Sequence, residues 1–170
     1  EHWNYSADSG CWLYNGVFAL QPSSEAEAES ALKARSFHIG DKAELVRGTV
    51  GGYTYNNGTI SGGTFQGESY NFRGTISNGT FQGILHNDSG TISGGTFEEV
   101  VEMNESTEGA KIEGGTFKKG IELNAYYPTI TDGLFDGKVS AAEGYPSMLS
   151  ISGGLFTNAA AVSTISPDNL

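Results

Sequence analysis

The stretch Gly58-Thr-Ile-Ser-Gly-Gly-Thr-Phe65 decides the fold, because the chain repeats it at short intervals. Two close copies and three degenerate copies follow; they cover Gly74–Phe81, Gly90–Phe97, Lys111–Phe117, Thr129–Phe135 and Ser150–Phe156. Successive isoleucines of the motif are 16, 16, 20, 18 and 21 residues apart, and the phenylalanines repeat those steps. The interval from Ile to Phe is therefore constant, while the segment after Phe varies in length. Such a pattern is typical of a solenoid in which every coil shares one corner.

The motif itself predicts how each coil is built. The triplet Thr-Ile-Ser is β-branched and alternating, so Ile60 is expected to point to the side opposite its neighbours. The glycine pair that follows, Gly62-Gly63, adopts positive φ freely and predicts a corner. Beyond this corner Phe65 faces inward again. Helical repeats of about 33 or more residues do not fit a 16-residue step, so the pattern predicts a parallel β-helix with stacked Ile and Phe columns.

The fold class predicted from this repeat is all-β: a parallel β-helix that spans residues 46–170. Solenoids leave sheet edges open at their ends, and these edges have to be covered. Residues 1–45, rich in aromatic side chains, are expected to form a small mixed N-terminal cap. The cap contains one predicted helix, over residues 23–35, because Ser24 and Glu27 have the spacing of a capping box.

Charge and composition exclude several classes of function. The chain carries 20 acidic against 9 basic residues and a formal charge of -11, which argues against nucleic acid and anionic membrane surfaces as partners. The sequence contains no run of about 18 apolar residues, which a membrane-spanning helix requires. The single cysteine, Cys11, excludes an internal disulfide framework and a cysteine-based zinc cluster. No cofactor or metal site is predicted, and the oligomeric state is left open.

Acidic residues after Phe97 are the candidates for catalysis. Several polysaccharide-cleaving β-helices use carboxylate clusters on one outer face, and acid–base cleavage of a glycosidic bond needs two carboxyl groups about 5–9.5 Å apart. The candidates are Glu98, Glu99, Glu102, Glu105, Glu108, Asp132 and Asp136, with Lys111, Lys118 and Lys119 on the next coil. The favoured interpretation is a solvated acidic loop. The three histidines belong to no recognisable motif and are interpreted as surface or core residues: His2, His38 and His86.

Rows of outward-facing threonine and serine allow a different interpretation. The residues that flank each inward isoleucine are Thr59/Ser61, Thr75/Ser77, Thr91/Ser93, Lys111/Glu113, Thr129/Thr131, Ser150/Ser152 and Thr164/Ser166. A flat array of threonines resembles the surface of ice-binding solenoids. Half of this row is serine, which lacks the methyl group, and Lys111 and Glu113 place charges in its middle. An exposed β-face also favours threonine for structural reasons alone.

Aromatic residues in the variable segments are the candidate binding residues: Tyr70, Phe72, Tyr126, Tyr127 and Tyr145. Insertions on solenoids collect on one face, which is often the binding face. Aromatic side chains at the tips of such segments can stack on sugar rings or fit into a protein partner. A structural role is the alternative, since a long coil also has room to fold its tyrosines inward.

The recurring Ile-Ser-Gly-Gly-Thr-Phe resembles the repeats of large cell-surface proteins of gut Firmicutes, over about residues 46–166. Those repeats look like the right-handed β-helices of pectate lyases. The resemblance implies an extracellular or bacterial cell-surface location and an adhesive role, with a glycan or a host or cell-surface protein as partner. It carries over no catalytic residues, because the sequence has no acidic cluster with a partner Arg or Lys of the pectate-lyase kind.

The function predicted is therefore a non-enzymatic, adhesin-like binding or spacer module that makes contact through its variable segments. One alternative is a carbohydrate-active β-helix enzyme, a lyase or a glycoside hydrolase, that uses Glu98 to Glu102 with the lysines of the neighbouring coil. A second alternative is an ice-binding solenoid. The sequence favours the non-enzymatic interpretation, since a fold by itself does not imply an activity.

Overall fold

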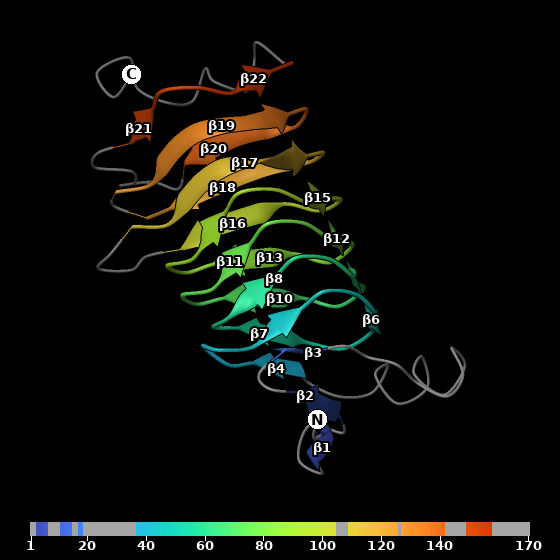
Figure 1. Cartoon of the computed structure of the whole chain (residues 1–170). Helices are drawn as coiled ribbons and strands as arrows, with labels where there is room; N and C mark the ends of the chain where they lie inside the picture. The colour runs from blue at the N-terminus through green and yellow to red at the C-terminus, as the bar shows by residue number, and fades with distance from the viewer. Residues whose placement is uncertain are drawn as a thin grey trace.

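The computed structural model describes residues 3–6, 11–14, 17–18, 37–104, 109–125, 127–141 and 149–157. Throughout these residues every regular element is a β-strand, and the strands wind into a parallel β-solenoid (Figure 1). The predicted all-β solenoid is therefore confirmed. The helix predicted over residues 23–35 lies outside the described residues.

The strands form two sheets. The fifteen-stranded sheet contains β1 (Trp3–Ser6), β2 (Cys11–Tyr14), β3 (Val17–Phe18), β5 (Glu44–Leu45), β6 (Thr49–Val50), β8 (Thr59–Ile60), β9 (Thr64–Phe65), β11 (Thr75–Ile76), β12 (Thr80–Phe81), β14 (Thr91–Ile92), β15 (Thr96–Phe97), β17 (Lys111–Phe117), β19 (Thr129–Phe135), β21 (Ser150–Ile151) and β22 (Leu155–Phe156). The seven-stranded sheet contains β4 (Phe37–Ile39), β7 (Thr54–Asn56), β10 (Ser69–Asn71), β13 (Leu85–Asn87), β16 (Val101–Asn104), β18 (Gly120–Asn124) and β20 (Lys138–Ala141).

The coils up to β16 contribute three short strands each, whereas in the next two coils the motif forms a single seven-residue strand, β17 or β19. In one coil these are β8 and β9, both in the fifteen-stranded sheet, and then β10 in the seven-stranded sheet. From β4 onward the strands pair in parallel with their counterparts in the next coil, in register except for a bulge between β17 and β19, so that Ile76 lies between Ile60 and Ile92. This pairing already includes residues upstream of position 46, because β4 pairs with β7 and β5 pairs with β8.

The coil is right-handed. Successive coils rise from β4 near the bottom of Figure 1 to β20 near the top. On the near side the chain runs from left to right, as the arrow of β19 shows, and it returns on the far side. This is the hand that the twist of β-strands favours for connections between parallel strands.

The interior holds columns of identical or similar side chains. The isoleucine and phenylalanine columns are fully buried from Ile60 and Phe65 to Ile130 and Phe135. Neighbouring phenylalanine rings stack with centroids 4.5–5.0 Å apart, which is the spacing of adjacent strands. Each such side chain contributes about 1.5–3 kcal/mol of transfer free energy. The predicted stack is confirmed, and it is the main source of stability.

One glycine of each pair makes the corner between the two strands of the motif. The second glycine has a φ between +105° and +136° in every copy: Gly63, Gly79, Gly95, Gly115, Gly133 and Gly154. Asn78 and Asp132 replace the first glycine in two coils, and each accepts a hydrogen bond of 2.8 Å from the next backbone N–H. Because residues with a Cβ rarely adopt this φ, the second position requires glycine for its backbone conformation.

The segments after the phenylalanines from Phe65 to Phe135 also carry a strand, which differs from the expectation. The sequence places Tyr70 and Phe72 at the tips of variable segments, whereas Tyr70 is the middle residue of β10. The inward residues of this third strand are polar in several coils, which hides the hydrophobic alternation of a buried strand. Asn56, Asn71 and Asn87 are buried and joined in a ladder by side-chain hydrogen bonds of 2.8 Å.

Candidate functional site

A row of ring-bearing side chains covers the outer face of the seven-stranded sheet. His38, Tyr55, Tyr70 and His86 come from four successive coils and lie in register. They face outward because both neighbours of each residue in its strand are buried. The centroids of successive rings lie 4.7, 5.2 and 4.6 Å apart, and their planes are within 17° of parallel. We call these four residues the aromatic row.

Stacking within the aromatic row determines what it can bind. Each ring covers the faces of its neighbours, so the rings present their edges and polar atoms to solvent. Phe72 packs beside the row, 6.1 Å from Tyr55 and 6.2 Å from Tyr70, and is 36% exposed. The row is therefore a continuous ridge of ring edges. A sugar ring cannot lie on the face of Tyr55 or Tyr70, because these faces are already occupied.

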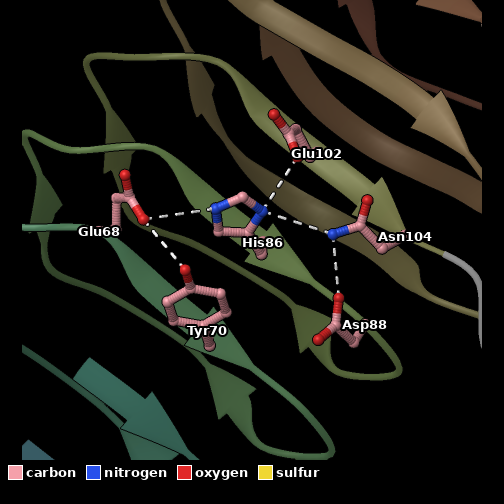
Figure 2. Close-up of polar contacts among 6 residues, drawn as sticks. All are labelled: Glu68, Tyr70, His86, Asp88, Glu102 and Asn104. Atoms are coloured by element: carbon pink, nitrogen blue, oxygen red, sulfur yellow. Dashed lines mark hydrogen bonds and ion pairs between the residues drawn. The ribbon is translucent and has the colours of Figure 1, made fainter. Parts of the chain in front are cut away.

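Glu68 links two members of the row at its polar end (Figure 2). Its Oε2 accepts a hydrogen bond of 3.0 Å from the Tyr70 hydroxyl and lies 4.0 Å from Nε2 of His86. Burial raises the pKa of the Tyr70 phenol to about 12, and the hydrogen bond to the negative charge of Glu68 adds to this rise. Tyr70 is therefore a protonated hydrogen-bond donor at neutral pH, and it is not a general base.

The second ring nitrogen of His86 faces the next coil. Nδ1 lies 2.9 Å from Oε2 of Glu102 and 3.5 Å from Nδ2 of Asn104, which also donates a hydrogen bond of 3.0 Å to Asp88 (Figure 2). Both nitrogens of the imidazole thus have an acidic neighbour. The 2.9 Å contact between Nδ1 and Glu102 orients the ring in the stack, whereas the 4.0 Å between Nε2 and Glu68 is longer than a hydrogen bond.

A groove lies beside the aromatic row, at the corner that precedes the seven-stranded sheet. It has a volume of about 520 Å³, is open to solvent, and is lined in part by Tyr53, Gln66, Glu68 and Glu99. Tyr53 is 50% exposed, and its ring is tilted by 46° against Tyr70 at a centroid distance of 6.5 Å. Unlike the rings of the aromatic row, it does not stack face to face on the ring of the next coil.

Two of the acidic candidates for catalysis are held in ion pairs between coils. Lys118 lies 2.7 Å from Glu98, and Lys119 contacts both carboxylate oxygens of Glu99 at 2.7 Å. Exposed pairs of this kind contribute only about 0.2–1 kcal/mol each to stability. Their effect here is to neutralise the two acids that an enzyme would need as free carboxyl groups.

The remaining acidic candidates are scattered. Glu105 and Glu108 lie outside the described residues. Glu102 contacts His86, and Asp132 caps a corner glycine, as described above. Asp136 accepts a hydrogen bond of 3.0 Å from the hydroxyl of Thr157. In the described part of the chain these contacts are structural, because they cap a corner or join neighbouring coils.

Outward threonines form two columns on the fifteen-stranded sheet. The predicted column passes through Thr59, Thr75 and Thr91 and then meets Lys111. A second column, which the sequence did not single out, lies on the strands that contain the phenylalanines. Its members are Thr49, Thr64, Thr80, Thr96 and Thr116, all in register.

The structure brings together two of the predicted binding residues. Tyr70 belongs to the aromatic row, and Phe72 packs beside it. Tyr127 follows β18 on a later coil and is 57% exposed. Tyr126 and Tyr145 lie outside the described residues.

Four residues of this region escaped the sequence analysis as binding candidates: His38, Tyr53, Tyr55 and His86. A signal for the aromatic row was present, because positions 38, 55, 70 and 86 are 17, 15 and 16 residues apart, close to the step of the motif. Histidine and tyrosine do not look like copies of one another in a sequence. Only the register of the third strand shows that they form one column.

Comparisons with protein-family models, with curated proteins and with solved structures yield no match to this chain. Among the described residues, no group of three or more His, Cys, Asp or Glu side chains is placed to hold a metal ion. No helix in this described part is long and apolar enough to cross a membrane. The function therefore has to be inferred from the chemistry of the surfaces.

Proposed function

We propose that this chain is a non-enzymatic extracellular surface module that binds its partner through the outer face of the seven-stranded sheet. The observation that carries this proposal is the aromatic row, which lines up ring edges over four successive coils. Packing of the interior does not require such a row, since outward positions on the other sheet are small and polar, as at Thr59 and Ser61. An apolar ridge with a polar rim has the composition of a binding surface.

The charge of the chain restricts the partner. Glu68, Glu102 and Asp88 surround the polar end of the row, and the formal charge of the chain is -11. An anionic partner would be repelled both at a distance and at contact. The partner is accordingly a neutral or basic molecule, either a glycan or a protein of a host or cell surface.

A binding assay tests this proposal. The labelled chain is applied to a glycan array and to intact bacterial and epithelial cells, next to a variant with Tyr55→Ser and Phe72→Ser. We expect the variant to lose most of the binding, about tenfold or more, because the ridge is removed. The matched control is Thr75→Ala with Thr91→Ala on the opposite sheet, and circular dichroism melts confirm that all three proteins fold. Equal binding by both variants would place the contact elsewhere, and no binding by the wild type would make the chain a spacer.

A carbohydrate-active enzyme is the alternative that the sequence left open. Acid–base cleavage needs two carboxyl groups that reach the substrate about 5–9.5 Å apart, but Glu98 and Glu99 are engaged by lysines of the next coil. The ion pairs therefore favour a module that binds its ligand without cleaving it. Incubation with neutral and acidic glycans is expected to release no reducing ends. If the wild type releases reducing ends and the Glu99→Gln variant does not, the chain is an enzyme instead.

Ice binding is a second candidate, which the column of five in-register threonines from Thr49 to Thr116 favours. The regular spacing of this column is the feature that an ice surface would match. Against it, Glu98 and Lys118 directly follow the strands that carry Thr96 and Thr116, and they place charges beside the column. We expect no thermal hysteresis from the purified chain. Hysteresis that Thr80→Val with Thr96→Val abolishes would move the function to the fifteen-stranded sheet.

A further inference from the structure

The groove beside the aromatic row has a floor without side chains. Gly52, Gly67 and Gly83 occupy the same corner position in three successive coils, with their backbones stacked so closely that a methyl group on Gly67 would meet the Gly52 carbonyl. The next coil has Glu99 at this position, and Glu99 lines the groove at that end. The two spacings of about 4.8 Å between these three coils give the floor a length of roughly 10 Å.

The walls of the groove combine an uncovered aromatic ring with hydrogen-bonding groups. Tyr53 lines one side with a half-exposed ring, and Gln66 adds an amide. Oε2 of Glu68 is engaged by Tyr70, which fixes the carboxylate and leaves Oε1 as the oxygen for a ligand. Glu99 is fixed in the same manner by Lys119. The two carboxylates are therefore held in place before a ligand arrives, which reduces the entropic cost of binding.

We propose that this groove is a subsite for a short stretch of a neutral glycan, with one sugar ring packed on Tyr53 and its hydroxyls bonded to Gln66 and Glu68. The electron-rich face of tyrosine attracts the C–H-bearing face of a sugar, and carboxylate and amide oxygens accept hydrogen bonds from hydroxyl groups. The inference rests on the proposed function, because it assigns a ligand class to the same side of the molecule.

Size and charge select this class of ligand. The volume of about 520 Å³ is within the range of small-molecule sites, about 300–1,000 Å³, and the open ends of the site suit a chain that continues beyond it. The carboxylate of Glu68 in the lining repels uronic acids and sulfated sugars. A peptide strand finds no free edge to pair with, because β7, β10 and β13 are interior strands of their sheet.

Calorimetric titration of the full chain tests the subsite. The probes are neutral hexasaccharides of glucose, xylose, mannose, galactose and N-acetylglucosamine, with hexagalacturonic acid as the anionic counterpart. We expect at least one neutral hexasaccharide to bind and hexagalacturonic acid not to bind. Tyr53→Ala is expected to weaken the affinity about tenfold, and Tyr53→Phe, which keeps the ring face, by no more than about threefold. Tyr127→Ala is the matched control, because Tyr127 is equally exposed but lies on another coil.

Amide resonances provide a second readout that does not depend on a variant. In a nitrogen–proton correlation spectrum, the backbone amides of Gly52, Gly67 and Gly83 are expected to shift on addition of the bound hexasaccharide, while that of Gly40 stays in place. The same spectrum shows whether each variant is folded.

The possible results separate the subsite from the proposed function. Failure of all five neutral hexasaccharides to bind, or an affinity that Tyr53→Ala leaves unchanged, overturns the subsite. The proposed function still stands in that case if the chain binds cells or protein through the aromatic row. Loss of binding in the Tyr55→Ser, Phe72→Ser variant with full binding in Tyr53→Ala would identify a protein partner on the ridge and an unoccupied groove. Absence of any binding in both assays removes both proposals.

Discussion

At the corner of each coil a single glycine, such as Gly79, holds a backbone conformation that other residue types rarely adopt. Its φ is +124°, and an added Cβ would lie 3.3 Å from the ring of Phe65 in the column. Gly40 provides a contrast, since no atom lies within 4 Å of the place where its Cβ would be. Substitutions at the two positions therefore test different effects. At Gly79 they test the need for a positive φ at the corner, and at Gly40 they test only the flexibility that a glycine adds to the unfolded chain.

Substitution of Gly79 by alanine is expected to destabilise the fold by about 1–3 kcal/mol, because the new side chain strains the backbone at this φ. Gly40→Ala is expected to change stability by less than about 1 kcal/mol, in the stabilising direction, since it restricts only the unfolded chain. Urea denaturation followed by circular dichroism measures both. Equal effects of the two substitutions would contradict the account of the corner.

Tyr70 makes stability depend on alkaline pH. The pKa of its phenol rises from 10.0 in the unfolded chain to about 12 in the fold, so the folded state keeps a proton that the unfolded state has lost. Its contribution to stability is fully present below pH 10 and disappears as the pH rises toward 12. Melting curves across this window should show a smaller decline of Tm in Tyr70→Phe than in the wild type. Parallel declines would show that Tyr70 is not involved.

Among the elements, the third strand of each coil shows how a solenoid buries polar side chains. In β10 both inward residues are polar: Asn71 is bonded on each side to Asn56 and Asn87, while the hydroxyl of Ser69 has no hydrogen-bond partner among the described residues. The strand thus contains one satisfied and one unsatisfied polar group at equivalent depth. Their energetic effects should have opposite signs.

Replacing Asn71 by alanine is expected to destabilise the chain by about 1–3 kcal/mol for each of the two partners that it leaves unpaired, the amide nitrogen of Asn56 and the amide oxygen of Asn87. Ser69→Ala removes an unsatisfied hydroxyl from the same strand and is expected to be neutral or stabilising. Chemical denaturation of both variants compares them directly. A loss of stability in Ser69→Ala as large as that in Asn71→Ala would rule out the ladder as the reason.

The sequence predicts those strands whose inward side chains are apolar. Ile92 and Phe97 alternate with polar neighbours and recur at a fixed interval, so their columns follow from the pattern. Ser69 and Asn71 give no such signal, because a polar residue that faces inward looks like a residue of a loop. The candidate site lies on this third strand, and for that reason Tyr70 was found as an aromatic residue but its partners Tyr55 and His86 were not.

For the whole molecule, stability is spread over nearly equivalent coils. Each coil contacts only the coil before it and the coil after it, so the free energy of unfolding is approximately a sum over coils and their interfaces. Residues 75–90 make up one complete coil of 16 residues and end in the same Gly-Thr junction with which they begin, Gly74-Thr75 and Gly90-Thr91. Such a unit can be removed without a change of register.

Deletion of residues 75–90 is expected to leave a folded solenoid that is shorter by about 4.8 Å, the spacing of one strand. Ile60 and Phe65 then stack directly on Ile92 and Phe97. Circular dichroism and small-angle scattering measure the β-content and the length. Deletion of residues 75–82 is the control, because it removes both strands of the motif and keeps the rest of the coil, and it is expected to prevent folding. Similar behaviour of the two deletions would contradict a modular solenoid.

The interchangeable coils also have a consequence for inheritance. Near-identical copies in a gene recombine with one another and slip during replication, and both processes gain or lose whole copies. Because an added or lost copy leaves the hydrophobic columns matched, the encoded protein survives the change. Lineages that carry this gene can therefore acquire longer or shorter versions in single steps, without passing through an unfolded intermediate.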